Sequence, residues 1–339
     1  MSPPTPVHLL TGFLGSGKTT LLCRMLADPA MAGAAVLVNE FGEIGLDHEL
    51  LERVDDTVVL LKSGCLCCTV RGELAEALLT LQSRRARGEV PFFGRVAVET
   101  TGMADPYPAL STVRSHPVLR SHYRNAGVVT TVDAVNAPGL LDTRLEALRQ
   151  IGAADLLVLT KTDLAAAGTV RKLIRRLTAV NPSARVVTAL EVRAADFLAE
   201  AGDTPPAPAA ALAHHRDGTF RAESPVTSFS LAVDEPIDWT GFGLWLTMLL
   251  DRHGENVFRV KGILNLEGED RPVAVHGVQR LVHSPVHMER WADGRRTSRL
   301  VFVVNGLDHG RIEASFHAFQ AMSRRVAGSL KRCEIAPRL

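Results

Sequence analysis

Residues 12–19 have the sequence GFLGSGKT, a complete match to the phosphate-binding loop pattern G-x4-G-K-[ST]. A strand-like run at residues 7–10 precedes the loop, and an amphipathic stretch over residues 19–28 follows it, which is the context that the pattern requires. Glycines let the backbone N–H groups of such a loop turn toward phosphate oxygens. The sequence therefore predicts a nucleotide site between a strand and the helix that follows.

Within this loop, the side chains have distinct expected roles. We expect Lys18 to bridge the β- and γ-phosphates and Thr19 to ligate Mg²⁺. Together with Glu99, these two are the predicted catalytic residues. The predicted nucleotide-binding residues are Gly12, Gly15, Ser16, Gly17, Lys18, Thr19, Thr20, Gly102, Lys161 and Asp163.

Strand-like and helix-like segments alternate through the first half of the chain. The expected strands are residues 7–10, 35–38, 57–61, 95–98, 127–132 and 156–159, and helical patterns include residues 19–28, 73–87 and 170–180. Such alternation indicates an α/β domain with a mostly parallel sheet and helices on its faces. Together with the loop pattern, it predicts a P-loop nucleotide-binding domain, and the base-recognition motif described next indicates a P-loop GTPase domain.

Two further motifs follow expected strands. Residues 99–102, ETTG, place an acid where P-loop proteins hold Mg²⁺ through water, and a glycine where they sense the γ-phosphate. Residues 160–163, TKTD, are similar to the Asn-Lys-x-Asp motif for base recognition, with Thr160 in place of Asn. The Asp163 carboxylate can accept hydrogen bonds from guanine N1–H and N2–H₂, whereas adenine would leave it unpaired. The Lys161 stem can cover the base, and we expect Thr160 to lose the amide bridge to the base and the phosphate loop.

Three thiols are clustered in residues 62–69, KSGCLCCT, which follow an expected strand. Cys65, Cys67 and Cys68 are soft ligands that suit zinc, copper(I) and related ions. A three-thiolate set leaves a position open, as exchange of a metal requires. A dithiol redox switch is the main alternative, and buried cysteines that act as small apolar residues are a weaker one.

Further metal candidates lie between and after these motifs. Residues 39–47, NEFGEIGLD, follow the second expected strand, where P-loop GTPases keep a switch loop. Glu40 and Glu43 are candidate ligands there, and His116 is a candidate beyond ETTG. Each of the three is as readily interpreted as a solvated or capping side chain.

The second half of the chain differs in composition. Residues 202–213, GDTPPAPAAALA, indicate a linker, and they are followed by His214 and His215. Later strand and helix patterns predict a smaller C-terminal α+β domain of undetermined topology. We expect a GTPase domain over residues 1–200, a linker over 201–222 and the C-terminal domain over 223–339.

Composition excludes several functional classes. The 339-residue chain has 38 basic and 37 acidic residues and only 5% aromatics, which argues against nucleic acid or an anionic membrane as a partner. No apolar run is long enough for a membrane span, and no signal stretch is evident, so we expect a cytoplasmic protein with five reduced cysteines. The sequence leaves a monomer and a homodimer equally open.

The motifs GFLGSGKTT, VNEFGEIGLD, SGCLCCTV, ETTG and TKTD, in this order, resemble those of the CobW-type family of P-loop GTPase metallochaperones. The segments VKGIL from residue 260 and HGVQ from residue 276 resemble that family's C-terminal domain. The resemblance implies slow GTP hydrolysis with Mg²⁺, and metal binding at Cys65, Cys67 and Cys68 that depends on the nucleotide. Relatives are associated with zinc homeostasis, cobalt insertion for cobalamin synthesis and nitrile hydratase activation.

The resulting hypothesis is a GTPase that binds zinc, or alternatively cobalt, and transfers it to a client metalloprotein under control of GTP and GDP. One alternative is a nucleotide-dependent sensor of metal or redox state. Another is a chaperone whose cargo is a protein to be activated, as in the nitrile hydratase activators.

Overall fold

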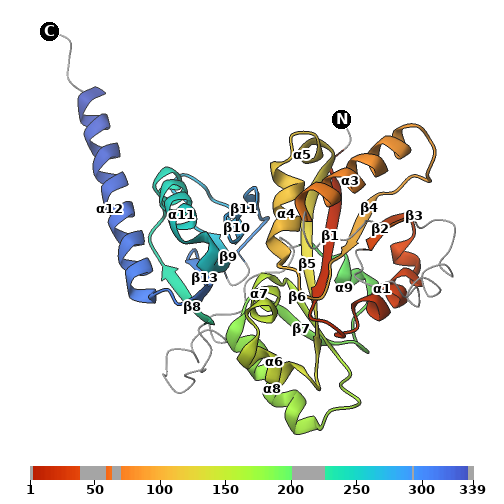
Figure 1. The fold of residues 1–339 in the computed structure, drawn as a ribbon. Coiled ribbons are helices and arrows are strands. Elements are labelled where there is room, and N and C mark those ends of the chain that lie inside the picture. The colour runs from red at the N-terminus through yellow and green to blue at the C-terminus, as the bar shows by residue number, and fades with distance from the viewer. Residues whose placement is uncertain (1–2, 39–58, 63–69, 201–225, 292–293, 335–339) are drawn as a thin grey trace. The chain divides into compact units, whose positions relative to one another are not determined.

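The described residues fall into two units, one made of residues up to 200 and the other of residues from 226 onward (Figure 1). The computed structural model describes residues 3–38, 59–62, 70–200, 226–291 and 294–334. The predicted linker, residues 201–222, lies outside the described residues. Each unit has its own sheet.

The first unit contains a seven-stranded parallel sheet in the order β3-β2-β4-β1-β5-β6-β7. Its strands are β1 (Thr5–Gly12), β2 (Ala34–Val38), β3 (Val59–Lys62), β4 (Arg95–Glu99), β5 (Tyr123–Asp133), β6 (Leu156–Thr160) and β7 (Arg185–Thr188). Along β1, β5 and β6, side chains on both faces of the sheet are buried. Burial on both faces explains why these strands are apolar runs rather than alternating patterns.

Helices cover both faces of this sheet. Figure 1 shows α1 (Lys18–Leu26) and α9 (Ala194–Phe197) on one side and α4 (Pro106–Ser115) and α7 (Leu145–Ala153) on the other. The remaining helical elements are η1 (Pro29–Met31), α3 (Val70–Ala86), α5 (Leu119–His122), α6 (Ala137–Thr143) and α8 (Ala167–Val180). Leu22 of α1 and Phe197 of α9 are buried in one cluster with the strand residues Leu10, Val36 and Val158. That cluster fixes α1, and with it the loop that enters the helix.

The strand order brings the predicted motifs to one edge. Because all strands are parallel, the loops after β1, β4, β5 and β6 leave the sheet at the same end. The register pairs Leu10 of β1 with Glu99 of β4, and Asp133 of β5 with Thr160 of β6. The phosphate loop, ETTG and TKTD therefore lie side by side, although hydrogen-bonded residues of the phosphate loop and TKTD are up to 146 positions apart in the sequence.

The second unit is built on a six-stranded antiparallel sheet. The main path runs β11-β10-β9-β13-β8, and β12 pairs with β10. The elements are β8 (Val226–Val233), α11 (Trp239–His253), η2 (Gly254–Asn256), β9 (Val257–Leu264), β10 (Val273–Val278), β11 (Leu281–Val282), β12 (Val286–His287), β13 (Ser298–Asn305) and α12 (His309–Glu334).

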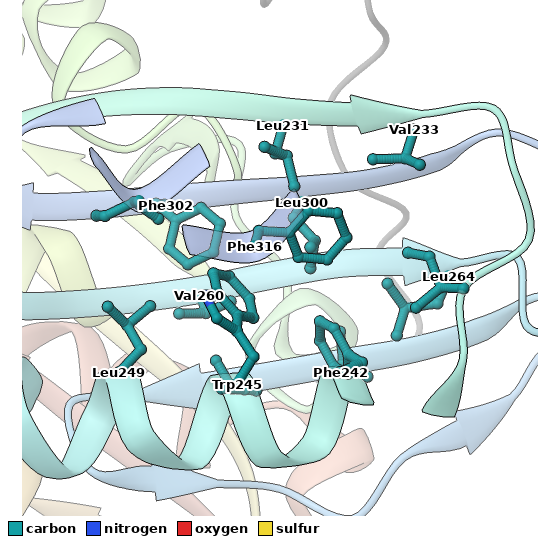
Figure 2. Packing of buried hydrophobic residues seen from close by; sticks show 14 of the residues in the cluster. Leu231, Val233, Phe242, Trp245, Leu249, Val260, Leu264, Leu300, Phe302 and Phe316 are labelled. Carbon is teal, nitrogen blue, oxygen red and sulfur yellow. The ribbon is translucent and has the colours of Figure 1, made fainter. Parts of the chain in front are cut away.

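Both long helices of this unit contribute to its core. Figure 2 shows Trp245 of α11 among Phe302 of β13 and Phe316 of α12. The rings of Trp245 and Phe316 meet edge to face with centroids 5.1 Å apart, a favoured aromatic geometry. The indole N–H of Trp245 donates to the Ser315 hydroxyl at 2.9 Å, so its buried polar atom is satisfied. These contacts hold α11 and α12 together over the sheet.

The predicted fold class is confirmed: a parallel-sheet P-loop domain is followed by a smaller α+β domain. The helices between residues 106 and 153 were not predicted, and α12 (His309–Glu334) extends beyond the helical pattern of residues 312–326 at both ends. In the described parts of the chain, no helix is long and apolar enough to cross a membrane.

Candidate functional site

The phosphate loop has the backbone conformation that its glycines permit. Gly12, Gly15 and Gly17 have φ values of 142°, 69° and 83°, in the region that side chains rarely adopt. A Cβ on Gly12 would lie 2.2 Å from the hydroxyl oxygen of Thr131, on β5. The Ser16 and Thr131 hydroxyls are also hydrogen-bonded at 2.7 Å. The loop is thus held closely against the end of β5, and position 12 admits only glycine.

Lys18 begins α1 and lies back along the loop. Its Nζ donates to the carbonyl oxygens of Gly12 at 3.1 Å and Phe13 at 3.3 Å, and only 9% of the residue is exposed. Both partners belong to the loop itself, so the ammonium group is positioned inside the curve of the phosphate loop. This position suits the predicted role of Lys18 in binding the β- and γ-phosphates.

Thr19 and Glu99 meet across the site. The Thr19 hydroxyl donates to Glu99 Oε1 at 2.7 Å, and Glu99 is buried at 4% exposure. Position 99 ends β4, while Thr19 lies one residue inside α1. Two oxygen groups at the mouth of a phosphate loop are the ligand type that Mg²⁺ prefers, so the residues fit the predicted ion. Thr20, next on α1, is exposed.

Gly102 is in close contact with the phosphate loop. A Cβ there would lie 2.6 Å from the backbone nitrogen of Leu14, so only glycine allows this approach. The amide of Gln150, on α7, donates to the carbonyl oxygens of Gly102 at 3.2 Å and Ala104 at 3.0 Å. Gln150 is buried at 1% exposure and thereby fixes the ETTG loop from the side of the core. Sequence reasoning missed this residue, which no motif marks.

One expectation about the base loop is wrong. Thr160 does not lose its bridge to the phosphate loop, because its hydroxyl donates to the Ser16 carbonyl at 2.8 Å. Thr160 is buried at 7% exposure, and a threonine hydroxyl at this point is close enough to reach the loop without the longer amide of Asn. The other half of the expectation, that Thr160 lacks the contact that the Asn amide makes with the base, remains a prediction.

Lys161 connects three segments. It has a left-handed backbone with φ of 54°, and its Nζ donates to Gly15 O at 2.8 Å and to Asp133 Oδ2 at 2.7 Å. Burial alone would raise the pKa of Asp133, but hydrogen bonds from Lys161, Asn136 and the backbone outweigh it and hold that pKa below its ordinary value. Asp133 is therefore an anion that orients Lys161 over the phosphate loop.

Asp163 and its surroundings face solvent. Asp163 is exposed at the start of the loop after β6, and Leu164 beside it is 70% exposed. Leu190, after β7, is 84% exposed, and Leu14 of the phosphate loop is 58% exposed. Of these three, Leu14 is an exposed apolar side chain of the phosphate loop itself. The exposed position of Asp163 agrees with its predicted role.

Of the candidate transition-metal ligands, only His116 lies among the described residues. Cys65, Cys67, Cys68, Glu40 and Glu43 lie outside the described residues. His116 ends α4, which leads from the Glu99 loop back toward Tyr123 at the opposite, amino end of the sheet, where β5 pairs with Thr5. The structure thus does not bring His116 to the phosphate loop. Among the described residues, no group of three His, Cys, Asp or Glu side chains could hold a metal ion.

Comparison with known proteins gives a match along most of the chain. Residues 6–188 match the family described as CobW/HypB/UreG, nucleotide-binding domain, and residues 226–320 match the cobalamin synthesis protein cobW C-terminal domain. The zinc chaperone YjiA of Escherichia coli is 35% identical over 321 residues, which cover 92% of this chain and 98% of YjiA. The zinc chaperone CobW of a Sinorhizobium species is 28% identical and covers 92% of this chain, with 96% of its own length matched.

A solved structure gives the same result. The Zn(II)-bound YjiA GTPase from E. coli superposes with a TM-score of 0.71 at 30% sequence identity, and the match covers 94% of this chain and 99% of that one. The resemblance noted in the motifs is therefore confirmed over both units. The chain belongs to the CobW/HypB/UreG family of nucleotide-binding proteins and carries the cobW-type C-terminal domain.

Proposed function

We propose that this chain is a GTP-hydrolysing metallochaperone that binds a transition metal at Cys65, Cys67 and Cys68 and transfers it to a client protein. The chain is a GTPase, in line with its family and with a relative of known structure described as a GTPase. Zinc is the metal that we expect, since full-length relatives are named zinc chaperones, and cobalt is the alternative. A cytoplasmic location would keep the thiols reduced.

The observation that carries this proposal is where the strands end. The register aligns Lys62 of β3, Val38 of β2 and Glu99 of β4 in one row across the sheet. Neighbouring strands are about 4.8 Å apart, so the chain enters the cysteine segment about 10 Å from Glu99. The segment with Glu40 and Glu43 starts after Val38, one strand from Glu99. Both metal segments thus begin beside the nucleotide site.

The described side chains supply the nucleotide chemistry. Lys18 would bind the β- and γ-phosphates from inside the loop, and Asp163 would accept the guanine N1–H and N2–H₂ protons. Thr19 and Glu99, now hydrogen-bonded to each other, would hold Mg²⁺ directly and through water. The ion would neutralise charge on the transferred phosphoryl group. Gly102, which packs closely against Leu14, would respond to the γ-phosphate through that contact.

Nucleotide control requires a difference in metal affinity between two states. A ligand shifts an equilibrium only by its differential affinity, so GTP must favour an arrangement in which the thiolates bind metal more tightly. Each ten-fold difference in metal affinity corresponds to about 1.4 kcal/mol. Hydrolysis then releases the metal to the client because the GDP state holds it less tightly.

A release assay tests the proposal. The zinc-loaded protein with Mg²⁺·GTP is placed in a single-turnover reaction with a fluorescent zinc chelator, and phosphate and zinc release are recorded together. We expect zinc release to follow phosphate release, and to stop when GTP is replaced by a non-hydrolysable analogue. Zinc release at the same rate with the analogue would contradict nucleotide control. A Cys67→Ser variant that retains full zinc loading would contradict the thiolate site.

A further inference from the structure

Asp133 is a buried carboxylate beside the phosphate loop that no sequence motif marks. It is the last residue of β5, between the strand that leads to the phosphate loop and the strand that leads to TKTD. The residue is 4% exposed. An ionised carboxylate so deeply buried needs several hydrogen bonds or a cation to be stable.

The donors around this carboxylate account for both of its oxygens. Oδ1 accepts from the backbone N–H groups of Val135 at 2.8 Å and Asn136 at 3.2 Å. Oδ2 accepts from the Asn136 side-chain amide at 2.8 Å and from Lys161 Nζ at 2.7 Å. Three of the four donors come from the turn directly after β5, so the carboxylate is fixed in place before Lys161 reaches it.

Lys161 is the partner whose long side chain must be ordered to make this contact. A lysine side chain has four rotatable bonds, and ordering it in one conformation costs substantial entropy. Here its Nζ also donates to Gly15 O at 2.8 Å, and its left-handed backbone is one that a non-glycine residue keeps only when its surroundings enforce it. The Lys161 side chain is 37% exposed, so part of it is accessible to a ligand.

We infer that Asp133 is a positioning residue for guanine-nucleotide binding, which acts by holding Lys161 across the phosphate loop so that its stem is ordered before the base arrives. The inference rests on the proposed nucleotide function and adds a residue to it. Pre-ordering a contact increases affinity because the ligand no longer bears the cost of ordering. Asp133 touches no reacting atom, so its effect should fall on binding rather than on the hydrolysis step.

Four variants of the full chain test this. Binding of a fluorescent GDP analogue is titrated for Asp133→Asn, Lys161→Met, the double variant and Asp142→Asn. Asp142 is the matched control, because it forms an ion pair with Arg176, on α8. We expect Asp133→Asn to weaken GDP binding about ten-fold, and to raise the KM for GTP without a matching fall in kcat. The control should bind within two-fold of the unchanged chain.

The double variant separates positioning from general damage. If Asp133 acts through Lys161, the double variant should bind GDP no more than about two-fold more weakly than Lys161→Met alone. The inference would be overturned if the two fold-losses in GDP affinity multiplied in the double variant. It would also be overturned if Asp133→Asn bound GDP within two-fold of the affinity of the unchanged chain. If Asp133→Asn does not fold, Asn136→Ala decides: it removes one donor to Asp133, and unchanged GDP affinity would overturn the inference.

GDP binding by the unchanged chain separates a failure of the Asp133 role from a failure of the proposed nucleotide function. Tight GDP binding by the unchanged chain together with an unaffected Asp133→Asn variant would refute only the role of Asp133. An unchanged chain that binds no guanine nucleotide would refute the proposed nucleotide function and this inference together.

Discussion

The bridge from Thr160 to the phosphate loop can be tested by removing one hydroxyl group. Thr160→Val keeps the side-chain shape but deletes the 2.8 Å hydrogen bond to Ser16 O, in a residue that is 7% exposed. A buried hydrogen bond contributes about 1 kcal/mol, and an unsatisfied buried carbonyl adds a cost of similar size. We therefore expect the free energy of unfolding to fall by about 1–2 kcal/mol.

The same substitution should also weaken nucleotide binding. If the bridge holds the phosphate loop in its binding conformation, a loss of about 1 kcal/mol of this pre-organisation weakens GDP binding about five-fold. Thr112→Val is the matched control, because Thr112 is 4% exposed and its hydroxyl donates to Pro108 O at 2.9 Å within α4. Urea unfolding should show similar destabilisation of both variants, whereas fluorescence titration with a GDP analogue should show weakened binding only for Thr160→Val. Equal GDP affinity in the two variants would refute the bridge as a determinant of binding.

Three further predictions concern single residues. Gly12→Ala should lower GDP affinity at least about 100-fold, because the added Cβ would collide with Thr131. Calorimetric titration with GDP checks this, and Gly139→Ala is the control because a Cβ at Gly139 meets no atom within 4 Å. Retained GDP binding by Gly12→Ala would contradict the prediction. Glu99→Gln should lower Mg²⁺ affinity and kcat about 10- to 100-fold, which phosphate release over a range of Mg²⁺ concentrations measures; an unchanged Mg²⁺ dependence would remove Glu99 from the ion site. Burial lowers the pKa of His8 to about 4 from 6.5, so neutral His8 stabilises the fold above pH 6.5, and this stability is lost as the pH falls toward 4. Between pH 7.5 and pH 5, the free energy of unfolding of His8→Leu, measured with urea, should therefore fall by about 2 kcal/mol less than that of the unchanged chain. Parallel pH profiles of the two proteins would contradict the lowered pKa of His8.

Much of the nucleotide site could be predicted because its chemistry is local in sequence. The phosphate loop needs glycines at fixed positions, and its roles for Lys18 and Thr19 follow from the spacing alone. The proximity of Glu99 to Thr19 follows from the rule that parallel strands end at one edge. These inferences need only the strand assignment and not the detailed packing of the domain.

The parts that sequence reasoning missed depend on contacts between distant segments. Gln150 reaches Gly102 only because α7 packs beside the ETTG loop, and no periodic pattern indicates that contact. Asp133 had a usable signal, a carboxylate directly after a buried strand, but neighbouring motifs were stronger. Thr160 was judged by comparison with Asn, whereas the structure shows that the hydroxyl is within reach of Ser16 O. The antiparallel order of the C-terminal sheet likewise depends on pairings between distant strands, such as β13 with β8.

Titration of the reduced protein with Co²⁺ as a spectroscopic probe would show whether the metal affinity of the thiolate site depends on the nucleotide. The titration is performed with Mg²⁺ and either a non-hydrolysable GTP analogue or GDP, and with Zn²⁺ as the competitor. We expect strong thiolate-to-cobalt absorption, and a Co²⁺ affinity at least about ten-fold higher with the GTP analogue than with GDP. The absorption should disappear in Cys67→Ser. Equal Co²⁺ affinity in the two nucleotide states, or no thiolate absorption in either, would contradict this expectation.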